Sequence, residues 1–107
     1  MALQDDIING ESDRIEFKEQ IPKDASKIVR TVVAFSNTQG GRIILGVSDD
    51  RRIVGVDGDP FKTRDQAIDI IMNGCSPTVC PSSFITTIDG KSLVVIECLP
   101  ERLARIV

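Results

Sequence analysis

Carboxylates beside predicted sheet elements are the residues best suited to chemistry in this chain. Glu11 and Glu16 flank the start of the first predicted strand, and Asp49 and Asp50 lie at the tip of the first predicted hairpin. Mg²⁺ binds a few carboxylates together with water and substrate phosphate, and such an ion can activate water for phosphodiester cleavage. Residues five apart on one strand face opposite sides, so a shared site requires Glu11 on a turn before the strand, where Asn9-Gly10 favours one. The alternative is that these carboxylates are solvated or cap turns.

Basic residues form a second candidate site. On a helical wheel Lys23, Lys27 and Arg30 fall opposite the apolar arc of the first long predicted helix. The hairpin that follows could extend the positive patch through Arg42, Arg51 and Arg52, although the adjacent Asp49 and Asp50 offset their charge. Such a stripe can contact phosphate groups, and the alternative is a face that only keeps the chain soluble.

Several catalytic and binding classes are excluded by composition. The chain has no histidine, so Ser-His-Asp and Cys-His catalysis are ruled out. Three cysteines without a secretory signal are expected to be reduced and mostly buried, and a zinc site would need a further ligand. There is neither a Gly-Lys-Ser/Thr phosphate loop nor a GxGxxG motif, so a nucleotide site would need a less regular construction. Without Trp or Tyr, base stacking is not indicated.

Short elements must position these residues. Residues 14–18 alternate polar and apolar, which predicts a strand with Phe17 on one face and Glu16 on the other. Asp24 is predicted to cap a helix that runs to about Asn37. Gly40-Gly41 then ends the helix, because glycine accepts the left-handed conformation of a helix cap.

A hairpin is predicted next, from residues 42–48 to residues 53–56. Its register places Gly46 opposite Gly55. Two opposed glycines leave a bare strip of sheet that another backbone or a ligand could approach closely. A local kink or bulge is the equally weighted alternative.

The second half repeats a helix and a hairpin. Thr63 begins a capping-box pattern and predicts a helix over residues 64–73. Asp89-Gly90 is a strong two-residue turn signal joining strands 84–88 and 92–99. The predicted order is β-α-β-β-α-β-β, an α+β fold with a mixed sheet of about five strands and two helices packed on one face.

The length, the ends and the net charge of the chain indicate how many domains it forms and which partners it can bind. The 107 residues are expected to form a single domain, 1–107, and the apolar finish suggests the N-terminal part of a longer protein with a missing C-terminal domain. No signal peptide or membrane-spanning run is present, so we expect a cytoplasmic protein without a membrane partner. The net charge is −3, with 13 Lys and Arg against 16 Asp and Glu, so nucleic-acid binding requires a local basic face.

Several sequence blocks together resemble the Schlafen-type Alba-like domain. They are residues 11–18 (ESDRIEFK), 33–41 (VAFSNTQGG), 44–50 (ILGVSDD) and 53–55 (IVG), and the resemblance covers roughly residues 11–99. This family occurs in prokaryotic proteins interpreted as transcriptional regulators and in animal Schlafen proteins, and DNA binding is its proposed role. An older label describes it as a divergent ATPase-like domain, which the missing phosphate loop does not support.

The resemblance also implies a role for the carboxylates. Nuclease-active Schlafens cleave RNA with a metal-dependent site of two glutamates five apart and an aspartate after the Gly-Val strand. Glu11 and Glu16 match the glutamates, and Asp49 matches the aspartate, with Asp50 as its neighbouring alternative. Those nucleases pair two such domains into a basic cradle, whereas this chain has one.

Three functions follow. The leading hypothesis is a nucleic-acid-binding (DNA or RNA) module of a transcriptional regulator; its phosphate contacts are Lys18, Lys27, Arg30 and Arg42. The alternative is an endoribonuclease in which Glu11, Glu16 and Asp49 hold Mg²⁺ or Mn²⁺; otherwise no cofactor is expected. The third is a non-catalytic dimerisation or ligand-sensing domain, and a homodimer could also join two modest basic faces.

Overall fold

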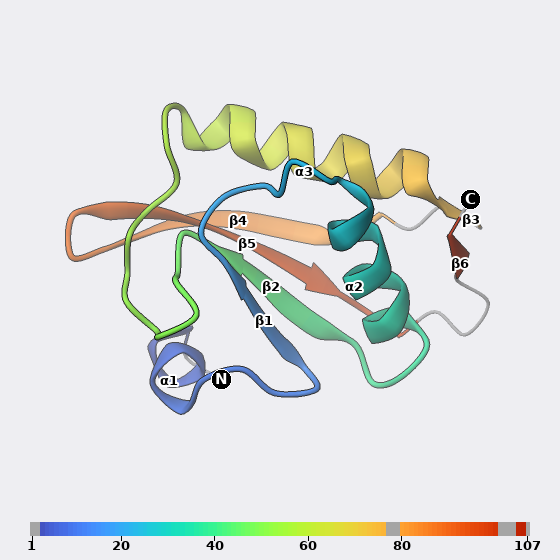
Figure 1. Ribbon diagram of the computed structural model, residues 1–107, viewed down its shortest axis with the longest axis horizontal. Helices are drawn as coiled ribbons and strands as arrows, with labels where there is room; N and C mark the ends of the chain where they lie inside the picture. Colours follow the sequence, from blue (N-terminus) through green and yellow to red (C-terminus); the bar gives the residue numbers. More distant parts are fainter. Residues whose placement is uncertain (1–2, 77–79, 101–104, 107) are drawn as a thin grey trace.

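A four-stranded mixed sheet forms the centre of the computed structural model, which describes residues 3–76, 80–100 and 105–106 (Figure 1). The strands lie in the order β1-β2-β5-β4, with β1 parallel to β2 and the other pairs antiparallel. They are β1 (Ile15–Lys18), β2 (Gly41–Leu45), β4 (Ser82–Ile88) and β5 (Lys91–Cys98). A separate two-stranded sheet pairs β3 (Cys75–Ser76) with β6 (Arg105–Ile106). The predicted α+β class and mixed sheet are confirmed.

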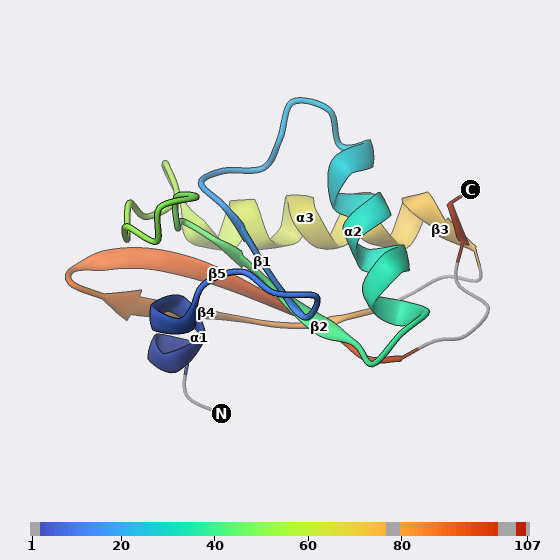
Figure 2. The same ribbon diagram turned by 60° about the horizontal axis from the view of Figure 1, so that its bottom comes forward.

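Two helices cover one face of the sheet, as predicted. The apolar arc of α2 (Ser26–Ser36) buries Ile28, Val29, Val32 and Phe35, and α3 (Pro60–Gly74) buries Ala67 and Ile71. These side chains share one core cluster with sheet residues that include Ile43 and Ile96. Figure 2 shows α2 and α3 on the same side of the strands.

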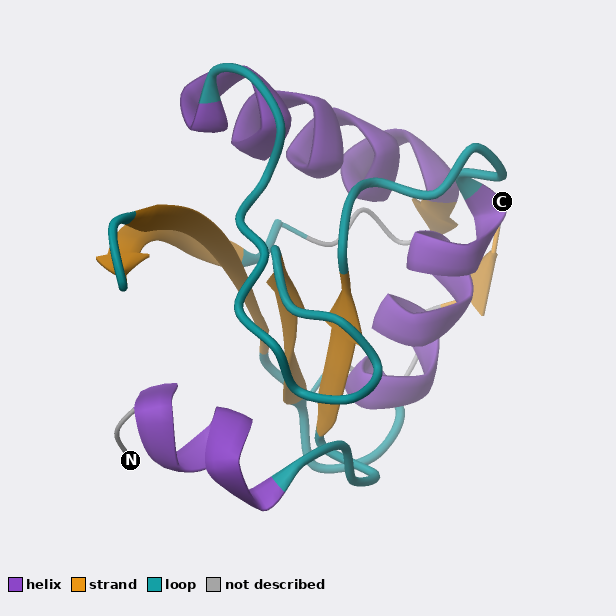
Figure 3. Ribbon diagram, turned by 60° about the vertical axis from the view of Figure 1, so that its left-hand side comes forward, coloured by secondary structure: helices purple, strands orange, loops and turns teal. Residues whose placement is uncertain are grey.

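A third helix, absent from the sequence prediction, lies on the other face. Helix α1 (Leu3–Asn9) buries Ile7 against a second cluster that contains Phe17, Ile44 and Val95. The alternation of β2 and β5 sends successive side chains to the two clusters, so both strands are buried on both faces. Figure 3 shows α1 separated from α2 and α3 by the sheet.

The predicted first hairpin is shorter than expected. After β2, only an isolated bridge between Val47 and Ile53 remains of its second strand. Gly55 does lie opposite Gly46, and its N–H donates to the Gly46 carbonyl at 2.9 Å. The strip is not open, because a Cβ on Gly46 would lie 2.6 Å from Cδ2 of Leu93. The glycines therefore permit close internal packing.

Helix starts differ from the prediction, whereas the second hairpin agrees with it. Helix α3 begins at Asp59-Pro60, and the Asp59 carboxylate accepts the N–H of Phe61 at 2.9 Å, so the predicted Thr63 cap is wrong. Helix α2 begins at Ser26 with Ala25 at its N-cap, so the predicted Asp24 cap is wrong by one residue; the Asp24 side chain accepts the N–H of Ser26 at 3.1 Å. Asp89 and Gly90 both have positive φ, as the predicted tight turn requires.

Candidate functional site: a groove between β1 and α2

Strand β1 is an edge strand, and its alternation sets what faces each helix. Ile15 and Phe17 pack toward the cluster under α1. Glu16 points to the opposite face, as the sequence predicted, and lines a groove beside α2. The site is therefore built from one strand edge and one helix face.

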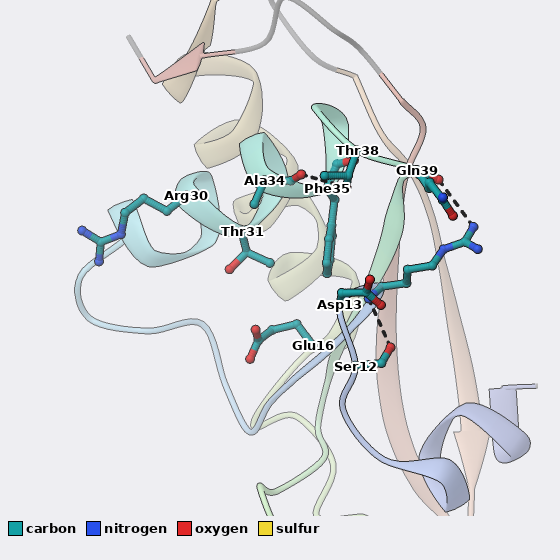
Figure 4. A pocket seen from close by; sticks show the side chains of 10 residues that line it. Ser12, Asp13, Glu16, Arg30, Thr31, Ala34, Phe35, Thr38 and Gln39 are labelled. Atoms are coloured by element: carbon teal, nitrogen blue, oxygen red, sulfur yellow. Dashed lines mark hydrogen bonds between the residues drawn. The ribbon is translucent and has the colours of Figure 1, made fainter.

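The groove has a volume of about 670 Å³ (Figure 4). Its wall on the β1 side consists of Ser12, Asp13, Arg14 and Glu16. Its wall on the α2 side consists of Arg30, Thr31, Ala34, Phe35, Thr38 and Gln39.

Local hydrogen bonds shape the helix wall. The hydroxyls of Thr31 and Thr38 donate to the backbone carbonyls of Lys27 and Ala34, both at 3.0 Å. At one end of the groove the Arg14 guanidinium donates to the Gln39 carbonyl at 3.4 Å. In Figure 4 the Glu16 carboxylate and the Thr31 side chain lie on facing walls. The two threonine hydroxyls are therefore bonded to the backbone of their own segment, and Thr31 faces the Glu16 carboxylate across the groove.

Glu11 and Glu16 form a carboxyl pair. One oxygen of Glu11 accepts the backbone N–H of Phe17 at 2.9 Å, which places Glu11 on the turn before β1. Partial burial, followed by the hydrogen bond to Glu11 and the charge of Glu11, raises the pKa of Glu16 from 4.5 to about 7. Asp49 raises it further, whereas Lys18 opposes the shift. Near neutral pH Glu16 is therefore protonated for part of the time.

The third predicted carboxylate is less closely placed. Asp49 is exposed and acts on Glu16 through its charge. Asp50, the neighbouring alternative, accepts a hydrogen bond from Ser48 and pairs with Arg52 at 2.9 Å. Within residues 3–76, 80–100 and 105–106, no three Asp, Glu or Cys side chains are arranged to hold a metal ion. A Mg²⁺ or Mn²⁺ ion held by Glu11, Glu16 and Asp49 stays a prediction.

Two predicted cations lie on the exposed side of α2. Lys27 and Arg30 are exposed, Arg30 lines the groove, and neither forms an ion pair within the described part of the chain. Asp24 lies near both: hydrogen bonds from Ser26 lower its pKa, and the charges of Arg30 and Lys27 add to this shift. Lys18 is half-buried in β1, on the same face as Glu16. Lys18 therefore projects from the face of the sheet that α2 covers.

Arg42 lies elsewhere. Its register opposite Ile15 and Glu97 places it on the α1 side of the sheet. It forms ion pairs with Asp6 at 3.0 Å and with Glu97 at 2.8 Å, and the Asp6 side chain is only 2% exposed. The structure thus separates Arg42 from Lys27 and Arg30. Asp6 was missed because its only sequence signal is an acid beside the apolar residues of a short N-terminal segment.

Neither the cysteines nor a membrane-spanning helix provides a further candidate site in the described part of the chain. Cys75 and Cys98 are buried and Cys80 is exposed, all as free thiols. Burial raises the pKa of Cys98 to about 12, so this thiol is a poor nucleophile. No helix in the described part of the chain has the length and apolar character needed to cross a bilayer.

Comparison with known proteins agrees with the sequence blocks. The profile of the family described as "Schlafen, AlbA_2" matches residues 11–105. An uncharacterized ATP-binding protein of Ureaplasma parvum is 36% identical over 73 residues, which is 64% of this chain and 21% of that protein. The chain therefore spans about a fifth of the length of this curated relative.

Solved structures show the same fold. One is the N-terminal domain of a protein from Nitrosomonas europaea described as related to the ATP-dependent DNA helicase RecG, with a TM-score of 0.69 and 28% identity. That match covers 85% of this chain and 65% of the other. The DIP2311 protein of Corynebacterium diphtheriae has a TM-score of 0.61 at 16% identity, over 98% of this chain and 25% of the other, and shows the fold alone.

Proposed function

Because the chain belongs to the Schlafen AlbA_2 family, we propose that it is a nucleic-acid-binding domain that contacts the phosphate backbone through the groove between β1 and α2. The observation that carries this proposal is a pair of exposed cations on α2 that form no ion pair within the described residues: Arg30, which lines the groove, and Lys27, three residues before it. In a longer chain, a further domain would supply the sequence specificity of a transcriptional regulator.

The carboxyl pair is compatible with phosphate at the groove. An ionised Glu16 would repel a phosphate, but its raised pKa of about 7 leaves it partly protonated near neutral pH and so reduces its charge. Lys18 adds positive charge on the same face. Contact with the backbone is favoured over base stacking, because the groove's aromatic residue, Phe35, is buried in the core.

The name of one similar protein supports a role with nucleic acid. A protein described as related to a DNA helicase has the same fold at 28% identity, which favours a role with nucleic acid. Another relative is named ATP-binding. In this chain the sequence has no phosphate loop, so ATP binding is not part of the proposal.

Binding is tested by fluorescence anisotropy with duplex DNA and with RNA at low salt. Lys27→Ala/Arg30→Ala should weaken binding about tenfold, because two phosphate contacts are lost. The matched control is Lys62→Ala/Arg105→Ala, which removes the same charge from exposed positions outside the groove. Equal loss in the two variants would assign binding to overall charge and contradict the groove.

A metal-dependent endoribonuclease is the second candidate. It is favoured by one observation: the charges of Glu11 and Asp49 both act on Glu16. Transfer RNA with Mn²⁺ is the test, comparing the parent chain with Glu16→Gln. Cleavage that is lost in Glu16→Gln but retained in Glu19→Gln would support a nuclease, and equal activity in all three would exclude it.

A further inference from the structure

Strand β4 is the other edge of the sheet, and one row of its backbone groups points outward. The turn at Asp89-Gly90 makes Ile88 and Lys91 the closing pair, which exchanges both hydrogen bonds. Alternate residues of β4 therefore bond to β5, and Ser83, Ile85 and Thr87 face away. A second observation supports this assignment of which residues face away. Ser92, the partner of Thr87, directs its carbonyl away from β4 and accepts the N–H of Val56 at 2.9 Å.

This outward row is uncovered in the described part of the chain. No hydrogen bond there reaches the N–H or carbonyl of Ser83, Ile85 or Thr87. No residue of β4 is fully buried, whereas Leu93 to Ile96 of β5 are all 0% exposed. Strand β4 is therefore covered on its β5 side and open on the other.

The opposite edge of the sheet is protected. On β1 the outward N–H of Phe17 donates to the Glu11 carboxylate at 2.9 Å, and that of Ile15 to the Ser12 carbonyl at 3.4 Å. Native edge strands are usually blunted by such caps, or by lysine, proline or bulges. Residues 82–88 (SSFITTI) contain no charge and no proline, and their register with β5 is continuous, without a bulge. The protein therefore caps one edge and leaves the other ready to pair.

We propose that β4 pairs antiparallel with β4 of a second copy of this chain, about a two-fold axis at Ile85, to form one continuous sheet across the dimer. In this register the outward-facing residues of the two copies lie opposite one another. Ser83 lies opposite Thr87 of the second copy, and Ile85 lies opposite Ile85 of the second copy. The flanking charge, Asp89, lies opposite Pro81, so no like charges meet. Self-complementarity of this kind is what a two-fold interface requires.

A second copy fits this edge for two further reasons. The Ile85 side chain packs partly against the core under α3, so the two Ile85 residues would extend an existing apolar surface. Four of the seven residues of β4 are β-branched, which suits pairing. One added ladder of this length is a small interface, so we expect a dissociation constant on the order of 10–100 µM.

Amide hydrogen exchange measured by NMR tests the pairing directly. The N–H groups of Ser83, Ile85 and Thr87 should become protected as protein concentration rises from about 10 µM to 1 mM, a range that spans the expected dissociation constant. Those of Phe84 and Thr86 should be protected throughout, because they bond to β5. Free exchange of the outward amides at the highest concentration, or protection independent of concentration, would overturn the proposal; the latter would assign the edge to a segment of the chain itself.

A charge pair tests the register. Ser83→Lys/Thr87→Lys opposes lysines across the two-fold and should give only monomer in light scattering at about 1 mM, tenfold or more above the expected dissociation constant. Ser83→Lys/Thr87→Asp opposes unlike charges and should dimerise. Retained protection of Thr86 shows that each variant is folded. Thr87→Pro, which removes one outward N–H and no bond to β5, should also weaken the dimer. Equal dimerisation of the two charge variants would contradict this register.

Discussion

Two of the candidate residues, Glu11 and Arg42, each bind two partners within the protein. Glu11 accepts the Phe17 N–H with one carboxylate oxygen and is hydrogen-bonded to Glu16 as well. Arg42 likewise joins two carboxylates, Asp6 and Glu97, that come from opposite ends of the chain. Both residues were candidates from sequence. Because each of them also holds other parts of the protein, substitution of either residue is expected to change stability as well as binding.

The pKa of Glu16 gives a pH-dependent stability. Because its folded pKa of about 7 exceeds 4.5, the native state holds an extra proton between these values, and stability falls as pH rises through this window. Glu16→Gln mimics the protonated form. It should match the parent chain at pH 4, below the unfolded pKa, and exceed it at pH 8 by about 1 kcal/mol, a value discounted because the groove is open to solvent. Urea denaturation at both pH values measures this, with the exposed Glu19→Gln as control.

Arg42 should matter for stability more than for binding. Arg42→Met leaves the buried Asp6 carboxylate without its cation and should cost about 3 kcal/mol of unfolding free energy. Replacing both partners, Asp6→Leu/Arg42→Met, should recover much of this loss, because no buried charge then remains unpaired. Urea denaturation of both variants checks the prediction. A loss below about 1 kcal/mol in Arg42→Met would show that the ion pairs contribute little.

At the scale of elements, local signals predicted local structure. The alternation of β1, the apolar arc of α2 and the Asp89-Gly90 turn are each encoded within a few residues, and all three are confirmed. Helix α1 was missed because its seven residues are too short to signal a helix alone, and Ile7 is buried by residues far along the chain.

The same reasoning applies to the site. The approach of Glu11 to Glu16 followed from a turn that the sequence predicts. The distance of Asp49 from the pair depends on the loop after β2, where Arg51 donates to the Ile8 carbonyl of α1 at 2.8 Å. That contact joins segments that sequence patterns do not connect. The approach of Glu11 to Glu16 was therefore predictable from local sequence, whereas the position of Asp49 was not.

The start of α3 provides a prediction at this scale. Asp59→Ala removes the side chain that accepts the Phe61 N–H and should cost about 1 kcal/mol. Thr63→Ala should change stability by less than about 0.5 kcal/mol, because Thr63 lies inside the helix and does not cap it. Thermal unfolding of the two variants compares the real cap with the one that the sequence pattern suggested. Equal losses would contradict the Asp59 cap.

Two glycines with positive φ provide a matched pair. At Gly46 an alanine would combine backbone strain with a clash against Leu93, so Gly46→Ala should cost about 3 kcal/mol. At Gly58 no atom lies within 4 Å of the added Cβ, so Gly58→Ala should cost about 1 kcal/mol through backbone strain alone. Chemical denaturation measures the difference. Similar losses would show that the space beside Gly46 can relax.

At the scale of the whole molecule, a net charge of −3 limits how strongly nucleic acid can be held. If Lys27 and Arg30 are the phosphate contacts, the logarithm of the association constant for duplex DNA should fall with the logarithm of salt concentration with a slope of about −1.8. Titrations from low to physiological salt measure this slope. A slope much steeper than this value would require further contacts, and one near zero would exclude phosphate binding.

The position of Glu11 links the rim of the sheet to the acid–base state of the groove. An extended peptide could join the β1 margin only by displacing the Glu11 carboxylate from the Phe17 amide. The displaced carboxylate would also lose its fixed position beside Glu16, which would then titrate closer to an ordinary glutamate. Occupancy of that margin and proton release are therefore thermodynamically coupled through one side chain.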